Sequence, residues 1–378
     1  DALIHCYLDG EDLEAFVNLM EDTDHARRQL SRRGLVALIG EGSRPDPTAP
    51  PLALPTTGLT ELDVPNAGTL RGLGVPTGIT LIIGDPHSGR QALIAAIAEG
   101  AYNHIPGDGR ERIVSIPDIV RVDADPGRPV RQVDLSPFGD AAGTPARPFS
   151  SDHAAPTESQ MAGVIEAILA GAQALVVDEA SSDPAFLAGD VRLGGLRPTA
   201  PPTFLSLANC AREIANDLRV SLVIGAFAHA REFLGIADTV FFLENGAIRD
   251  VTADARSLGR ENPMNGPLPP LPSPTQKSRW IIPSSIDPSL GAEEAVITAP
   301  DPHTLQFGRY RVDLSGVPQL VDIAQVNAIG LLLYHARLRH LDEPRTVTEL
   351  LDLLEDDLAS EGLDMLSRDQ RGDLARPR

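Results

Sequence analysis

Apolar and polar positions along the chain form blocks that predict an α/β protein. Continuous apolar runs of strand length, typical of buried parallel strands, occupy residues 79–83, 174–177 and 221–225. Apolar residues at helical spacing occupy residues 92–101, 157–169 and 205–218. Because strands and helices alternate in this order, we predict a largely parallel sheet covered by helices.

Shorter patterns surround this core. A helical pattern covers residues 11–33, and Gly34 is its expected C-cap. Further strands are predicted at residues 35–39, 59–64, 69–75, 113–116, 120–123, 240–243 and 247–251. We expect residues 113–116 and 120–123 to pair with each other, and Asn245-Gly246 to turn the last two strands into a hairpin.

Prolines between residues 263 and 274 predict an extended linker, because such a segment packs into neither a helix nor a sheet. Beyond it, residues 304–314 alternate like strands, residues 317–339 and 347–358 are expected to be helices, and polar residues 367–378 are expected to fray. We therefore divide the chain into an N-terminal helix-and-strand region (1–56), an α/β core (57–256), a proline-rich linker (257–302) and a small C-terminal α+β domain (303–378).

The formal net charge of the 378-residue chain is −21, and a surface with this charge repels phosphate backbones. We therefore expect no indiscriminate binding to nucleic acid. The most basic cluster, Arg27-Arg28 with Arg32-Arg33, lies on an acidic helical stretch and is interpreted as a solvated face. No apolar run approaches the length of a membrane span, so we expect no membrane association.

The two cysteines, Cys6 and Cys210, are too few for a disulfide framework or a metal site and are interpreted as ordinary thiols. The chain begins at Asp1 without an export signal, and together with the cysteine usage this predicts a cytoplasmic protein. Because no Met precedes Asp1, we expect the natural protein to begin further upstream.

Candidate chemistry begins directly after the strand at residues 79–83. Residues 84–91, Gly-Asp-Pro-His-Ser-Gly-Arg-Gln, have the spacing of the GxxxxGK[ST] phosphate loop. Its glycines let backbone amides converge on an anion near the positive N-terminus of the next helix. The residues expected to face a nucleotide are Gly84, Asp85, His87, Ser88, Gly89, Arg90 and Gln91.

Two positions of this loop depart from the motif. Arg90 replaces Lys and keeps the positive charge, but as a planar fork rather than a compact point charge. Gln91 replaces the Ser or Thr whose hydroxyl ligates Mg²⁺, so it would have to bring a longer amide oxygen to the metal. A strand-to-helix turn without any ligand explains the loop alone equally well.

Two acidic residues, Asp178 and Glu179, follow the apolar strand at residues 174–177 in the pattern of a Walker B site. In such a site the Asp holds Mg²⁺ and the Glu polarises the attacking water. Acidic pairs also follow strands by chance, but together with the loop this pair favours a nucleotide-binding ancestry. His229, after the strand at residues 221–225, is a further candidate for a γ-phosphate contact, although an ordinary loop residue is the simpler interpretation. The other histidines are not spaced like the ligands of a metal site.

Residues 101–111, Ala-Tyr-Asn-His-Ile-Pro-Gly-Asp-Gly-Arg-Glu, resemble the hallmark of a family of predicted ATPases of the ABC class, which are cytoplasmic bacterial proteins with relatives in some protists. Further stretches that agree are residues 34–37, 134–138, 159–160 with 166–167, 178–179, 237–240, 307–310 and 313–315. The resemblance extends from about residue 34 to residue 340, and members of the family carry an additional N-terminal region.

This resemblance implies a P-loop NTPase core of the ABC-ATPase type that binds ATP with Mg²⁺, forms a homodimer around the nucleotide, and carries a C-terminal accessory domain. By the same resemblance, Gln91 and Asp178 take the metal positions, and Asp178, Glu179 and His229 are the catalytic candidates. Ser159 and Gln160 end the signature stretch and become nucleotide contacts.

The chain also departs from the family's pattern. The signature stretch, Ser-Gly-Ser-Thr-Ser-Gln in relatives, reads Ala-Pro-Thr-Glu-Ser-Gln at residues 155–160. Ala155 lacks the hydroxyl and Pro156 lacks the N–H that a signature presents to the γ-phosphate, while Glu158 adds repulsion. His229 stands where relatives tend to have small residues, and residues 291–296 lack the basic side chains that relatives carry after the linker.

We therefore predict a diverged ABC-class protein that binds ATP weakly and hydrolyses it slowly or not at all. Two alternatives stay open. An active ATPase would use Arg90 and Gln91 in unusual roles, and a non-catalytic scaffold would have abandoned nucleotide altogether.

Overall fold

The computed structural model describes residues 10–139, 148–189, 204–259, 280–289, 296–366 and 374–376. These residues form two compact units, each built from separate stretches of chain. The first unit contains residues 10–122, 137–139, 171–189 and 204–259, and the second contains residues 123–136, 148–170 and the described residues from 280 onward. Several predicted features lie outside the described residues: Cys6, the proline-rich stretch 263–274 of the linker, residues 291–295 and most of the predicted frayed end at 367–378.

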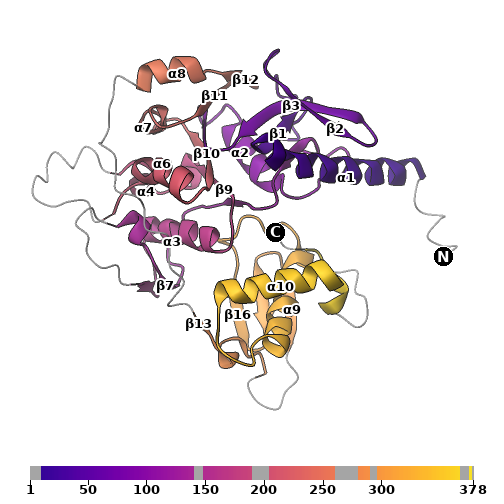
Figure 1. Ribbon diagram of the computed structural model, residues 1–378, viewed down its shortest axis with the longest axis vertical. Helices are drawn as coiled ribbons and strands as arrows, with labels where there is room; N and C mark the ends of the chain where they lie inside the picture. Colours follow the sequence, from indigo (N-terminus) through magenta and orange to yellow (C-terminus); the bar gives the residue numbers. More distant parts are fainter. Residues whose placement is uncertain are drawn as a thin grey trace, which may run out of the picture. The chain divides into compact units, whose positions relative to one another are not determined.

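A six-stranded sheet with the order β12-β11-β4-β10-β9-β6 forms the centre of the first unit. Its strands are β4 (Ile79–Ile83), β6 (Ile119–Arg121), β9 (Ala174–Asp178), β10 (Ser221–Ala226), β11 (Thr239–Glu244) and β12 (Ala247–Asp250). All neighbours pair in parallel except β12, which is antiparallel to β11 at one edge. Helices α2 (Arg90–Glu99) and α6 (Leu207–Asp217) lie on opposite sides of β10 (Figure 1). The predicted largely parallel sheet is therefore confirmed.

A second, antiparallel sheet of this unit has the order β2-β3-β1-β5. Its strands are β1 (Leu35–Gly40), β2 (Thr60–Val64), β3 (Gly68–Pro76) and β5 (Ile113–Ser115). Helix α1 (Gly10–Leu30) runs along it (Figure 1), and a 3-10 turn leads to Gly34, whose φ of 66° is the left-handed conformation expected of a C-cap. The short helices are α4 (Pro184–Ala188), α7 (Ala230–Leu234) and α8 (Thr252–Gly259).

The predicted pairing of residues 113–116 with 120–123 is wrong. β5 pairs with β1 and β6 pairs with β9, because the turn at Pro117 carries the chain from the antiparallel sheet to the parallel one. The predicted hairpin of β11 and β12 is confirmed. Asn245 and Gly246 both have positive φ, 51° and 73°, which its two-residue turn requires.

Arg27 is not part of a solvated face, which corrects the prediction for this residue. Its side chain is only 6% exposed and donates hydrogen bonds to the backbone carbonyls of Ser115, Gly100 and Tyr102. Arg28, one position further, is exposed as predicted. The guanidinium of Arg27 therefore ties α1 to the segment around β5.

The second unit begins with the hairpin of β7 (Val130–Val133) and β8 (Phe149–Ser151) and with helix α3 (Pro156–Leu169). Its later strands are β13 (Trp280–Ile281), β14 (Ile297–Asp301), β15 (Thr304–Phe307), β16 (Tyr310–Asp313) and β17 (Arg345–Thr346). β13 and the whole of β14 lie within residues 257–302, the segment expected to be linker, so these parts of that prediction are wrong.

Helices α9 (Ile323–Arg339) and α10 (Val347–Glu361) complete the C-terminal part. Leu305 and Phe307 of the three-stranded sheet pack with Val326 of α9 in one apolar cluster. α9 begins at Ile323 rather than at residue 317, because the Asp322 carboxylate caps it by accepting the Ala324 N–H at 2.7 Å. The expected small α+β domain is confirmed in its element types.

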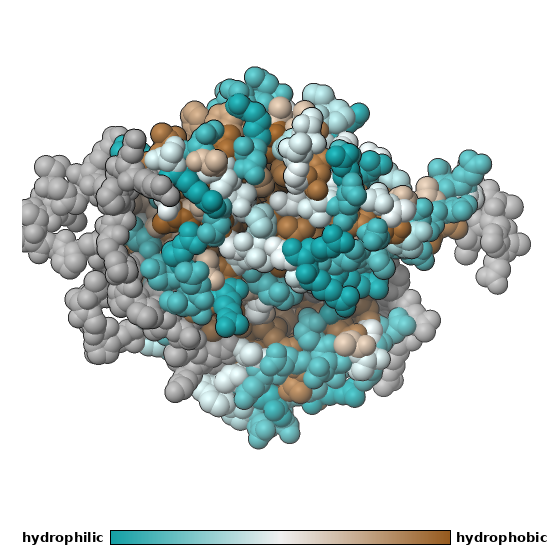
Figure 2. All heavy atoms as spheres, turned by 45° about the horizontal axis from the view of Figure 1, so that its top comes forward, coloured by the Kyte–Doolittle hydropathy of each residue, from teal (hydrophilic) through white to brown (hydrophobic). Residues whose placement is uncertain are grey.

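Within the described residues, no helix combines the length and the apolar character that crossing a bilayer requires. Hydrophilic side chains cover much of the coloured surface in Figure 2, and hydrophobic ones are scattered among them.

Candidate functional site

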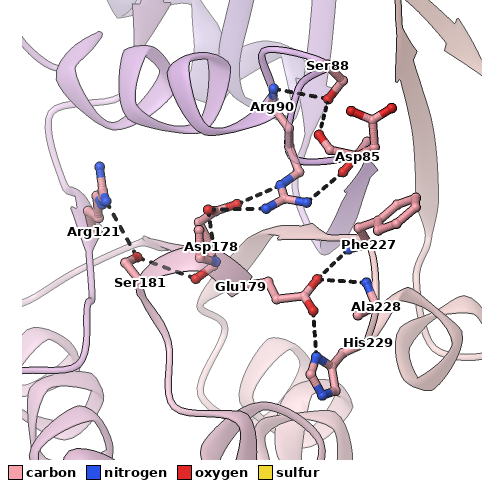
Figure 3. Close-up of polar contacts among 12 residues, drawn as sticks. Asp85, Ser88, Arg90, Arg121, Asp178, Glu179, Ser181, Phe227, Ala228 and His229 are labelled. Atoms are coloured by element: carbon pink, nitrogen blue, oxygen red, sulfur yellow. Dashed lines mark hydrogen bonds and ion pairs between the residues drawn. The ribbon is translucent and has the colours of Figure 1, made fainter.

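Three neighbouring parallel strands bring the predicted residues of the first unit together. β4 leads into the loop at residues 84–89, β9 ends at Asp178, and β10 lies between them. In register, Ile83 is opposite Ala226, and Asp178 is opposite Gly225. The loop and the acidic pair therefore meet at the carboxyl edge of the sheet, as Figure 3 shows.

Hydrogen bonds inside the loop engage several of its backbone amides. The Asp85 carboxylate accepts the His87 N–H at 2.7 Å, and the Asp85 carbonyl accepts the Ser88 N–H at 3.1 Å and its hydroxyl at 2.7 Å. The Ser88 Oγ in turn accepts the Arg90 N–H at 3.3 Å. Three amides that could face an anion, those of His87, Ser88 and Arg90, are thus directed at groups of the loop itself.

The two glycines of the loop are fixed by geometry. Gly89 has a φ of 86°, a left-handed conformation that leads directly into α2. A Cβ atom at Gly84 would lie 2.4 Å from the Ser88 Oγ and 3.1 Å from the Leu243 carbonyl oxygen, so a side chain there would displace the Ser88 hydroxyl. The frame of a phosphate loop is therefore present.

Arg90 folds back into the protein toward Asp178, the aspartate predicted to hold magnesium. Its Nε donates to Asp178 Oδ1 at 2.9 Å, and its Nη1 donates to the Gly84 carbonyl at 2.6 Å (Figure 3). Each of the two charged side chains is 3% exposed. A Cβ at Gly225 would meet Asp178 Oδ1 at 2.3 Å, so this glycine of β10 leaves the room that the ion pair occupies.

Glu179 points away from Arg90 toward the end of β10. Its Oε2 accepts the backbone N–H groups of Phe227 and Ala228, and its Oε1 lies 2.6 Å from His229 Nδ1 (Figure 3). Burial raises the pKa of Glu179, but the hydrogen bonds from Phe227 and His229 outweigh it and hold the pKa below its usual value. An ionised carboxylate next to an imidazole is an arrangement suited to general acid–base chemistry.

The residues as they lie do not fit a magnesium ion held by Asp178. Its Oδ1 and Oδ2 face Arg90 at 2.9 and 3.5 Å, and Oδ2 also accepts the Ala180 N–H at 3.2 Å. Gln91, the second expected ligand, is exposed on the first turn of α2. Since Mg²⁺ needs a near-octahedral shell of free oxygen ligands, no magnesium-dependent step follows from this arrangement.

The two residues predicted to end the signature belong to the second unit and are buried in it. Ser159 and Gln160 are 1% and 0% exposed. The Ser159 hydroxyl donates to the Pro156 carbonyl at 2.7 Å and accepts the Asp125 N–H at 3.1 Å. This side chain thus serves the fold of its own unit.

Sequence reasoning missed the groups that hold the acidic pair in place. Gly225 gives Asp178 its space, and the N–H groups of Phe227 and Ala228 bind Glu179. The available signal was Gly225 near the end of β10, since a glycine inside a strand often marks close approach of another group.

Two family models match the chain. Residues 9–270 match the ABC_ATPase family, described as a P-loop domain, and residues 296–378 match the MRB1590 C-terminal domain. No curated protein matches the chain. A similar solved structure is that of cbiO1 from Clostridium perfringens, part of the ABC transporter complex cbiONQ, with a TM-score of 0.33 and 11% identity over 57% of this chain and 87% of that chain.

Proposed function

Because the chain belongs to the ABC_ATPase family of P-loop proteins, we propose that it binds ATP weakly and hydrolyses it slowly or not at all. The family supports nucleotide as the class of ligand. The observation that carries the finer proposal is the buried ion pair of Arg90 and Asp178, which engages both the phosphate-facing position and the magnesium position.

A nucleotide with its metal would have to separate this pair. Breaking a buried ion pair costs about 3–5 kcal/mol. If the state that can bind nucleotide is less stable by this free energy, the apparent affinity falls by about two to four orders of magnitude. The Asp85 carboxylate in the loop adds repulsion toward phosphate.

Hydrolysis would suffer further, because the hydroxyl that ligates Mg²⁺ and the compact Lys charge are both replaced. Loss of one preorganised contact to a transition state typically costs about 10²–10³ in rate. A homodimer around the nucleotide is implied by the family and remains a prediction, which light scattering with and without Mg·ATP measures.

The test compares the natural chain with the variant Arg90→Lys/Gln91→Ser. Mg·ATP is titrated while binding heat and thermal stability are followed, and phosphate release is measured in parallel. We expect the natural chain to respond only at millimolar ATP and the variant to bind at least about tenfold more tightly. A natural chain that turns over ATP about once per second, as active P-loop ATPases do, contradicts the proposal.

A second candidate function, an ATPase that uses Arg90 and Gln91 in unusual roles, is favoured by the contact of Glu179 with His229. It predicts phosphate release by the natural chain that Glu179→Gln abolishes. A scaffold without nucleotide predicts instead that neither the natural chain nor the Arg90→Lys/Gln91→Ser variant responds to ATP.

A further inference from the structure

His335, His340 and Asp357 come together in the C-terminal part of the second unit. His335 lies near the end of α9, His340 is the C-cap residue of that helix, and Asp357 lies on α10. The Nε2 atoms of the two imidazoles lie 2.8 and 2.7 Å from the same oxygen, Asp357 Oδ2. One ligand atom from each residue lies within 4.8 Å of the other two.

We propose that this cluster binds a divalent transition-metal ion, with Zn²⁺ as the preferred ion. Two imidazole nitrogens and one carboxylate oxygen are a donor set that Zn²⁺ accepts in tetrahedral sites, and the fourth position is left to water. Imidazole nitrogens select against Mg²⁺ and Ca²⁺, which prefer oxygen ligands throughout.

The geometry needs only small adjustments to hold the ion. Ligand bonds of about 2.0–2.2 Å place neighbouring atoms of a tetrahedral shell about 3.3 Å apart. The two present contacts between nitrogen and Asp357 Oδ2 are each about half an ångström shorter. One nitrogen of each imidazole lies within 4.8 Å of the other, so side-chain rotations must lengthen the two contacts to Asp357 and bring the nitrogens to about 3.3 Å from each other.

The surroundings hold the three side chains in place and partly exclude water. His335 and His340 are each 13% exposed, and Asp357 is 16% exposed. One buried apolar cluster joins α9 to α10 next to the two histidines and Asp357 in sequence, and it contains Ala336, Leu341 and Leu354. Electrostatic attraction between a carboxylate and a cation is stronger beside such an apolar wall than in bulk water.

The charges of this region favour a cation. Arg339 is paired with Glu361 at 3.2 Å and Arg345 with Asp342 at 3.3 Å, so these two guanidinium groups are already engaged. α10 carries acidic residues along most of its length. Their field raises the local concentration of divalent cations around Asp357.

The competing role of the cluster is a hydrogen-bonded tie in which one carboxylate oxygen accepts an N–H from each imidazole. Such a tie stabilises the contact of α9 with α10 whether or not a metal is present. The metal site differs from it because binding of Zn²⁺ requires that both Nε2 atoms give up their hydrogens and turn their lone pairs to the ion.

The experiment titrates ZnCl₂ into the full chain after chelator treatment and follows the binding heat. Co²⁺ is added to a second sample, because its visible absorption reports a tetrahedral nitrogen and oxygen shell. We expect one Zn²⁺ per chain at this site, tetrahedral Co²⁺ bands, and no heat with Mg²⁺. The variant His335→Gln/His340→Gln is expected to bind at least about 100-fold more weakly, since loss of direct ligands exceeds the effect of lost supporting contacts.

Two matched variants separate metal binding from folding. Asp357→Asn keeps the size of the side chain and one oxygen that can accept from both imidazoles, but removes the charge. We expect it to weaken Zn²⁺ binding at least tenfold while the chain stays folded. His303→Gln removes an exposed histidine of the same unit and is expected to leave the titration unchanged. The proposal would be overturned if the folded natural chain bound no Zn²⁺ at micromolar concentration, or if all variants bound Zn²⁺ equally well.

Discussion

Arg90 Nε donates a hydrogen bond to Asp178 Oδ1 over 2.9 Å, and both side chains are 3% exposed. In an ABC-type site the first position faces phosphate and the second faces magnesium. Here the charges of Arg90 and Asp178 neutralise each other, in a space that exists because Gly225 of β10 has no side chain. The pair therefore takes up the charges on which nucleotide chemistry at this edge of the sheet would depend.

The Arg90–Asp178 pair is expected to be strongly coupled in stability. Arg90→Met leaves the Asp178 carboxylate buried and unpaired, so the free energy of unfolding should fall by about 3–5 kcal/mol. Asp178→Leu is the second single variant. The double variant Arg90→Met/Asp178→Leu removes both charges and should cost far less than the sum of the two single changes. Urea unfolding of the four chains measures the coupling, and additive effects would contradict a buried pair.

Asp85 is expected to restrain anion binding by the loop. Its carboxylate accepts the His87 N–H, so Asp85→Ala releases one amide and removes one negative charge. Affinity for ATP, measured by calorimetry, should rise about threefold to tenfold, which corresponds to about 0.7–1.4 kcal/mol. Asp301→Ala removes the same type of contact, to the His303 N–H, from the C-terminal part and serves as the control. An equal change in both variants would point to net charge alone.

Arg27 and Arg28 are neighbours with opposite roles, which provides a matched test of the first helix. Arg27→Met leaves the carbonyls of Ser115 and Gly100 without their charged donor, so we expect a loss of about 3 kcal/mol in unfolding free energy. Arg28→Met changes an exposed residue and should stay within about 0.5 kcal/mol. Thermal or urea unfolding distinguishes them, and similar values for both would mean that Arg27 is solvated after all.

Cys210 is expected to weaken the protein at high pH. Burial, with a smaller contribution from Glu213, raises the pKa of its thiol from 9.0 to about 12. Between these values the unfolded chain loses the proton and the folded chain keeps it. Its stabilising contribution is therefore complete below pH 9 and declines as the pH rises toward 12, by up to about 1.4 kcal/mol per pH unit.

The variant Cys210→Ala measures this effect, because every other titrating group is shared with the natural chain. Its unfolding free energy should fall less steeply above pH 9 than that of the natural chain. Parallel slopes in the two chains would show that the thiol titrates alike in both states.

Much of the fold could be predicted because it rests on local patterns. The apolar runs before Asp178 and Gly225 became buried strands of one parallel sheet, and Asn245-Gly246 became the turn of a hairpin. Which strands pair with each other was harder to predict from the sequence. Residues 113–116 and 119–121 lie close together in the chain, but pairing depends on which strands come to lie beside them from distant segments.

In the candidate site, too, features that depend on local sequence could be predicted and contacts between distant residues could not. The sequence determined the loop spacing, the acidic pair, the identities of Arg90 and Gln91, and the helix C-cap at Gly34, since each depends on residue type and spacing. Only the tertiary structure decided that Arg90 reaches Asp178, that Arg27 is buried, and that His335 and His340 meet Asp357. The physical reason is that burial and side-chain contacts between distant residues depend on how helices and strands pack, and periodicity along the chain does not encode the partner of a charged side chain.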